Sequence, residues 1–132
     1  MLPDEDILYL TAEEIIAVHA EALGSDEAAA ARQLRSRDGL AGAVARPQHH
    51  AHYAGADLGL QAAVLAHGIA EGQVFLDGNK RTALLAMLTF LRVNGVVVTA
   101  TDDELADWIL DLSRGDSVEM LAARIRSYSS QE

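Results

Sequence analysis

One short segment of the sequence gathers residue types that can bind phosphate and a metal ion. It covers residues 73–82, QVFLDGNKRT, at the expected start of a helix. The first amides of a helix lack internal partners and carry the positive end of its dipole, which favours anions. Gly78 lets the backbone approach a ligand closely, and Lys80 and Arg81 add two of the ten cationic side chains there. Because Asp77 offers hard oxygen ligands, the segment predicts a site for a nucleotide polyphosphate and Mg²⁺.

A purely structural interpretation of the same residues stays open at this point. Asp77 can simply cap the helix, and Lys80 and Arg81 can be solvated surface charges. Asn79, like Gly78, tolerates a left-handed backbone conformation and can serve only to form the turn before the helix. Residue types by themselves do not separate the two interpretations.

Composition limits the classes of protein that the chain can represent. Its 132 residues predict a single domain spanning 1–132, and 50% hydrophobic with 23% charged residues is typical of a globular chain. A net charge of −10 argues against direct nucleic-acid binding. The absence of cysteine excludes disulfides, thiolate metal sites and a cysteine nucleophile. Because the N-terminus is acidic and no stretch approaches the length of a membrane span, we expect a soluble, cytoplasmic protein without membrane contact.

Helix signals recur along the chain and predict an all-α fold. Thr11 and Thr101 each open a capping box with a glutamate three residues later. Residues 83–91 are apolar on every side, so the helix over 78–94 is expected to be the central, buried one. The expected helices cover residues 11–24, 25–35, 38–46, 57–72, 78–94, 101–112 and 117–128, and residues 96–99 form a short β segment.

Four of the five histidines lie in two further places. Pro47 is expected to end a helix, so residues 47–55 are predicted to be a loop that is mobile or faces the substrate. His49, His50 and His52 lie in this loop, and their spacing disfavours a metal site, which leaves their role open. His19 lies on the inner face of the first helix and is expected to be a hydrogen-bonded core residue.

The central segment also resembles a known family. Residues 75–84, FLDGNKRTAL, are similar to the core motif of the Fic/Doc (Fido) superfamily, which is written HxFx(D/E)(G/A)N(K/G)R. The similarity extends to residues 91–95, to an upstream flap segment at 37–47 and to a first helix at 11–19. The resemblance implies a compact Fido-type helical bundle around one central buried helix.

The resemblance also implies roles for individual residues of the motif. Asp77 would hold Mg²⁺, while Gly78 and Asn79 would present backbone amides and an amide side chain to the phosphates of ATP. Lys80 and Arg81 would bind phosphate oxygens.

The branch of the family follows from two details of the motif. Leu84 stands where AMP-transferring members have a second arginine, and together with Lys80 this resembles the Doc-like branch. That branch implies a toxin that transfers a phosphoryl group from ATP to a hydroxyl of a protein target, a translation elongation factor being the family's known kind of target. It also implies a small antitoxin that neutralises the toxin. The self-inhibitory pattern (S/T)xxxE(G/N) is missing, because His67 stands where Ser or Thr would precede Glu71, so inhibition by a second protein is expected.

One position departs from the motif. Gln73 occupies the place of the family's histidine, which is the general base of the reaction. A carboxamide can hydrogen-bond there but cannot accept the proton, so the site is expected to bind nucleotide and to transfer slowly. Gln73 is then a natural change in a non-transferring relative, an engineered substitution, or the sign that another base such as His67 is used. An AMP-transferring enzyme and a non-catalytic nucleotide- or protein-binding domain remain the alternatives.

Overall fold

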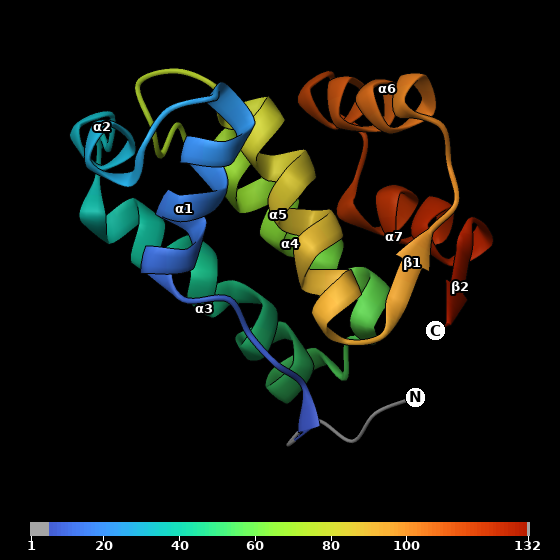
Figure 1. The fold of residues 1–132 in the computed structure, drawn as a ribbon. Helices are drawn as coiled ribbons and strands as arrows, with labels where there is room; N and C mark the ends of the chain where they lie inside the picture. Colours follow the sequence, from blue (N-terminus) through green and yellow to red (C-terminus); the bar gives the residue numbers. More distant parts are fainter. Residues whose placement is uncertain (1–5, 132) are drawn as a thin grey trace.

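The computed structural model describes residues 6–131 and contains seven helices and one small sheet there. Figure 1 shows the helices gathered into one bundle, with the sheet at one side. In chain order the elements are α1 (Ala12–Leu23), α2 (Glu27–Arg32), α3 (Arg37–Ala54), α4 (Leu58–Glu71), α5 (Asn79–Val93), β1 (Val96–Val98), α6 (Asp102–Ser113), α7 (Val118–Ser127) and β2 (Ser129–Gln131). The all-α prediction is confirmed.

Local capping explains where most of the helices begin. Both predicted capping boxes are present, at Thr11 with Glu14 and at Thr101 with Glu104. The second helix differs from the prediction, because Asp26 and not Ser25 caps it, and it ends at Arg32. Asp26 accepts a hydrogen bond from the amide of Ala29, so the helix starts one residue later than predicted.

The predicted loop over residues 47–55 is wrong, because α3 continues through Pro47 to Ala54. Pro47 removes one backbone donor, but its ring is buried and belongs to an apolar stripe that faces the bundle. The buried residues of this stripe follow helical spacing, and they are Leu40, Ala43, Pro47 and Ala51. Packing of the stripe therefore outweighs the cost of a proline inside the helix.

The most enclosed helix is α4, whereas the sequence pointed to the helix over 78–94. Ten of the fourteen residues of α4 are buried, against six of the fifteen in α5. α4 packs against α3, α5, α6 and α7, and its small residues allow close approach. A Cβ added at Gly68 would lie 3.3 Å from the Cβ of Ala43 on α3. The long apolar side chains of α5 instead leave half-buried surface at Leu84, Leu85 and Leu88.

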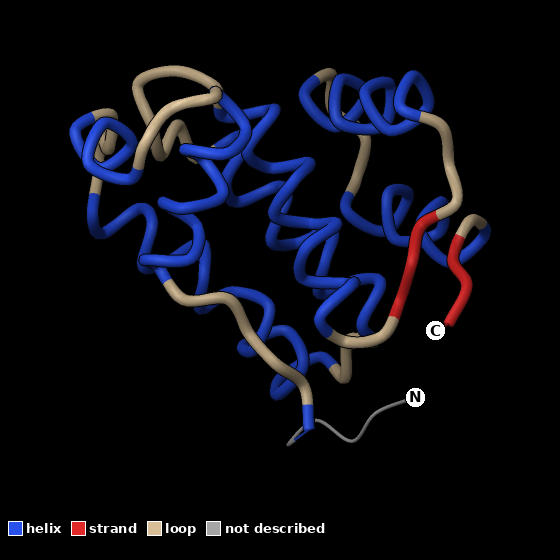
Figure 2. The backbone as a smooth tube through the Cα atoms, in the orientation of Figure 1, coloured by secondary structure: helices blue, strands red, loops and turns tan. Residues whose placement is uncertain are grey.

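A two-stranded sheet closes one side of the bundle (Figure 2). β1 pairs antiparallel with β2, with Val97 opposite Ser130. The predicted β segment is thus confirmed, whereas β2 was not expected because Ser-Ser-Gln has no strand pattern. Between residues 6 and 131 no helix combines the length and apolar character needed to cross a lipid bilayer.

An ion pair joins α7 to the start of α4. The guanidinium of Arg126 donates from Nε to Oδ2 of Asp57 at 2.7 Å and from Nη2 to Oδ1 at 2.9 Å. The hydrogen bond from Arg126 lowers the pKa of Asp57 below its usual 3.8, and partial burial opposes this effect. Because the folded-state pKa is the lower one, the pair stabilises the fold above pH 3.8, and this contribution disappears as the pH falls through the folded-state pKa.

Replacing Arg126 with methionine is therefore expected to lower the Tm near neutral pH and to change it little in strong acid. The loss is expected to be about 1 kcal/mol or less, since both side chains are partly exposed. Thermal unfolding of the two proteins, followed by circular dichroism across an acid pH series, measures the effect. A Tm difference that stays constant down to strong acid contradicts this prediction.

Candidate functional site

The segment between α4 and α5 lies against a distant part of the chain. Leu34 forms an antiparallel bridge with Phe75. The amide of Arg35 donates to the carbonyl of Val74 at 2.8 Å, and the amide of Leu76 donates to the carbonyl of Gln33 at 2.7 Å. In Figure 1 the α4–α5 loop accordingly lies at the same end of the bundle as α2 and the end of α1. The loop is thus held by residues 33–35, which lie outside the two helices that it joins.

Asn79 holds the loop from within. Its Oδ1 accepts from the amide of Phe75 at 2.9 Å, and its Nδ2 donates to the carbonyl of Phe75 at 2.8 Å. The Phe75 ring is fully buried. The Asn79 side chain thus uses Oδ1 and one hydrogen of Nδ2 to hold the backbone of Phe75, and its contact with phosphates stays a prediction.

Gly78 begins α5 in a conformation that other residues rarely adopt. Its φ is 77° and its ψ is 19°, and a Cβ there would lie 2.8 Å from Cδ2 of Leu23. Its amide donates to Oδ1 of Asp77 at 2.8 Å. Among the described residues no side chain accepts from the first amides within α5, and Asp77 holds only the amide of Gly78, so it is not the helix cap that the structural interpretation assumed. The first amides of α5 stay available to an outside acceptor.

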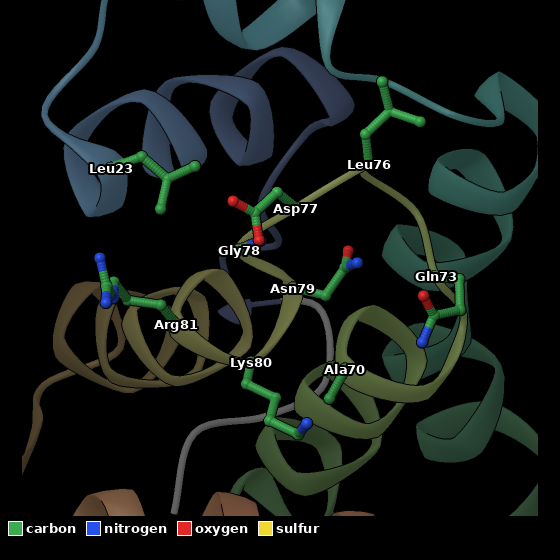
Figure 3. Close-up of a pocket in the computed structure, with 9 residues that line it drawn as sticks. All are labelled: Leu23, Ala70, Gln73, Leu76, Asp77, Gly78, Asn79, Lys80 and Arg81. Carbon is green, nitrogen blue, oxygen red and sulfur yellow. The ribbon is translucent and has the colours of Figure 1, made fainter.

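A cavity of about 430 Å³ opens over this helix end (Figure 3). Lys80 and Arg81 leave α5 on different sides of it, Lys80 toward Ala70 and Arg81 toward Leu23. Both are exposed, and neither pairs with a carboxylate in the described part of the chain. The cavity is lined by Leu23, Ala70, Gln73, Leu76, Asp77, Gly78, Asn79, Lys80 and Arg81. Two unpaired cations and uncapped amides form a local positive centre in a chain of net charge −10.

Comparison with known proteins identifies the family. A model of the Fic/DOC family matches residues 9–91, which span α1 to most of α5. This chain belongs to the Fic/Doc family. Two Doc proteins are similar to it. Toxin Doc of Mycolicibacterium smegmatis is 36% identical over 97 residues, 72% of this chain and 71% of that protein. Protein kinase doc of Escherichia phage P1 is 46% identical over 65 residues, 48% of this chain and 51% of that protein.

These similarities place the chain in the Doc-like branch of the Fic/Doc family. The matched region contains the α4–α5 loop and the cavity described above. The shorter match to the phage protein spans about half the length of that relative.

Gln73, expected at the position of the Fic/Doc histidine, lies at the edge of the cavity. It is exposed, and its φ of 50° is the one positive value among the described non-glycine residues. Gly72 before it has no room for a side chain, since a Cβ there would lie 2.2 Å from the carbonyl oxygen of Gly68. The loop therefore turns sharply out of α4 and presents residue 73 at the surface.

The other histidines do not line the cavity. His67 is half-buried on α4, and His49, His50 and His52 lie in the second half of α3. None of them is placed as a substitute base in this structure. Over residues 6–131 no three His, Cys, Asp or Glu side chains form a cluster able to hold a metal ion by themselves.

The sequence pattern identified the contiguous part of the lining but missed three residues. Leu23 comes from the end of α1, Ala70 from α4, and Leu76 is the exposed apolar residue of the loop. No local signal could have found Leu23, because it reaches the cavity only through the packing of α1 on α5. Leu76 lay within the motif, but at one of its variable positions.

Proposed function

We propose that this Fic/Doc protein is a Doc-like toxin that transfers a phosphoryl group from ATP, with Mg²⁺, to a hydroxyl of a protein target. Support comes from the open cavity over the start of α5, where Lys80 and Arg81 pair with no carboxylate of residues 6–131. The names of the two relatives, a toxin and a protein kinase, point to the same activity. A translation factor is the class of target that we expect.

The residues present fit a magnesium nucleotide. Oδ1 of Asp77 is held by the amide of Gly78, while Oδ2 has no hydrogen-bond partner among the described residues, and Asp77 lines the cavity (Figure 3). Mg²⁺ is usually held by one or two carboxylates together with substrate phosphates, so a single free carboxylate oxygen suits it. When bound, the ion would neutralise charge on the phosphates. Lys80, Arg81 and the amides of α5 would bind the remaining phosphate oxygens.

The attacking hydroxyl would come from the protein target and would meet Gln73 at the cavity edge. The carboxamide of Gln73 can accept a hydrogen bond from that hydroxyl and orient it. It cannot take up the proton, because a carboxamide is not a base near neutral pH. Slow transfer is the consequence that we propose for the chain with Gln73.

A second protein is the expected means of control. The self-inhibitory pattern of some Fic proteins is not found, since His67 stands where Ser or Thr would precede Glu71. A small antitoxin is therefore the partner that we propose, in agreement with the toxin name of one relative.

Gln73 also favours a second candidate function. A Fic/Doc domain that keeps the phosphate-binding residues but lacks the base can act by holding a nucleotide or a protein without transfer. In that case the original chain and the Gln73→His variant would both bind ATP, and neither of them would modify a protein. AMP transfer is the further alternative, and the position of the transferred label distinguishes it from phosphoryl transfer.

Replacing Arg81 with alanine tests the nucleotide site. We expect ATP with Mg²⁺ to bind about 10- to 100-fold more weakly, because a hydrogen bond between a cation and a phosphate is lost. Isothermal calorimetry on the purified protein measures the change. Arg114→Ala is the matched control, since Arg114 is exposed at the end of α6 and does not line the cavity. Equal ATP affinity of the Arg81→Ala variant and the original chain would show that Arg81 does not bind the nucleotide.

A further inference from the structure

His19 is a polar side chain in an otherwise apolar part of the core. It lies on α1, is fully buried, and stacks on Phe75 with ring centroids 4.0 Å apart and planes at 21°. Its Nε2 lies 2.9 Å from the carbonyl oxygen of Asp77, and its Nδ1 is buried without a partner. A carbonyl oxygen only accepts, so Nε2 carries the hydrogen and donates it. The expectation that His19 is a hydrogen-bonded core residue is thus confirmed.

The acceptor of this hydrogen bond gives His19 a more specific position. The carbonyl of Asp77 and the amide of Gly78 belong to one planar trans peptide, in which C=O and N–H point in opposite directions. By holding the carbonyl toward the core, His19 directs the amide of Gly78 away from it. That amide donates to Oδ1 of the Asp77 carboxylate at 2.8 Å. One peptide plane therefore connects a buried imidazole to an exposed carboxylate.

Other contacts fix the neighbouring parts of the loop but not this peptide. Asn79 holds both polar groups of the Phe75 backbone, and the bridge to Leu34 holds the segment around Phe75. Neither contact reaches the carbonyl of Asp77. Gly78 has φ in the left-handed region and no side chain, so this peptide has little intrinsic resistance to rotation. Apart from the Asp77 carboxylate itself, His19 is the group among the described residues that holds this peptide.

We infer that His19 is a positioning residue, which orients the Asp77 carboxylate through the Asp77–Gly78 peptide so that one of its oxygens stays free for Mg²⁺. This inference rests on the proposed function, because it assigns Asp77 to the metal of the nucleotide complex. His19 itself touches neither nucleotide nor metal. Its effect passes through the carbonyl that it holds and the amide on the other side of the same peptide.

Two substitutions of His19 separate positioning from simple packing. His19→Leu removes the donor and keeps an apolar side chain, whereas His19→Gln keeps an N–H at the same number of bonds beyond Cβ. Val18→Ala is the matched control, because Val18 is a buried neighbour on α1 with no hydrogen bond to Asp77. The Val18→Ala substitution weakens the packing of α1 but keeps the hydrogen bond from His19 to the carbonyl of Asp77.

The first measurement uses the ligand-free proteins. NMR of uniformly ¹⁵N-labelled chains records the amide signal of Gly78 and its hydrogen exchange. We expect His19→Leu to shift this signal and speed its exchange, while His19→Gln and Val18→Ala leave it close to that of the original chain. An unchanged Gly78 signal in His19→Leu would overturn the inference.

The second measurement titrates MgCl₂ at a fixed ATP concentration and follows binding by calorimetry. His19→Leu is expected to need about 10- to 100-fold more Mg²⁺, the usual effect of losing a group that orients a metal ligand, and His19→Gln is expected to restore most of the affinity. Equal Mg²⁺ dependence of His19→Leu and Val18→Ala would overturn the inference and leave the proposed function standing. Failure of the original chain to bind ATP with Mg²⁺ would overturn both.

Discussion

Gln73→His is expected to raise the rate of transfer from ATP to a protein by about 10²- to 10⁴-fold, the usual contribution of a general base. Imidazole titrates near neutral pH and can take the proton from the attacking hydroxyl, which a carboxamide cannot do. The backbone accepts the change, because residue 73 has φ of 50° and histidine is among the residues enriched at positive φ. Incubation of each chain with a bacterial lysate and ATP labelled on the α or γ phosphate measures the rate.

The position of the label decides which reaction occurs. Transfer of the γ label indicates a phosphotransferase, and transfer of the α label indicates the AMP-transferring alternative. Gln73→His combined with Arg81→Ala is the control, since it restores the base but removes a phosphate ligand, and it is expected to label much less protein than Gln73→His at an ATP concentration that does not saturate it. If Gln73→His labels no protein although it binds ATP, the transferase proposal fails and the binding domain becomes the better description.

Gly78→Ala is expected to destabilise the fold by about 2–5 kcal/mol, the largest stability effect that we predict for a single methyl group. Two costs add: a non-glycine residue in the left-handed region, about 1–2 kcal/mol, and overpacking of about 1–3 kcal/mol. The new Cβ would lie 2.8 Å and 2.9 Å from the two terminal carbons of Leu23, so the half-buried Leu23 side chain would have to leave its position against α5. Urea unfolding followed by circular dichroism gives the free energy of unfolding.

Gly95→Ala is the matched control for Gly78→Ala. Gly95 has φ of 82° and nothing within 4 Å of its added Cβ, so it carries the backbone cost alone. A further variant, Gly78→Ala with Leu23→Ala, is expected to recover part of the packing loss, and the double-mutant cycle isolates this contact. Equal losses at Gly78 and Gly95 would show that the approach of α1 to Gly78 has no energetic consequence.

The parts of the fold that depend on neighbours in sequence were predictable. The capping boxes at Thr11 and Thr101 and the cap at Ser117 act within one helical turn, so α1, α6 and α7 begin where the sequence indicates. The residues 73–81 that line most of the cavity are nearly contiguous. Their motif could therefore be recognised without knowledge of the fold.

The prediction for residues 47–55 was wrong for a different reason. Proline is unfavourable inside a helix, and that local rule ended the predicted helix at Arg46. The buried stripe that contains Leu40, Ala43, Pro47 and Ala51 packs on α4 and carries the helix past the proline. His49 and His52 consequently lie one helical turn apart on an exposed surface of α3 and not in a loop that is mobile or faces the substrate.

By itself the sequence determined the helical class, most helix starts and the chemical groups of the α4–α5 loop, because these depend on caps, periodicity and adjacent residues. Only the tertiary structure decided that α4 is the enclosed helix, that Leu23 lines the cavity and that Asn79 holds the loop backbone. It also brought His19 to the carbonyl of Asp77, 58 residues away along the chain. The physical reason is that a hydrogen bond needs its donor and acceptor within about 3 Å, and for groups so distant in sequence only the packing of α1 against α5 provides that proximity.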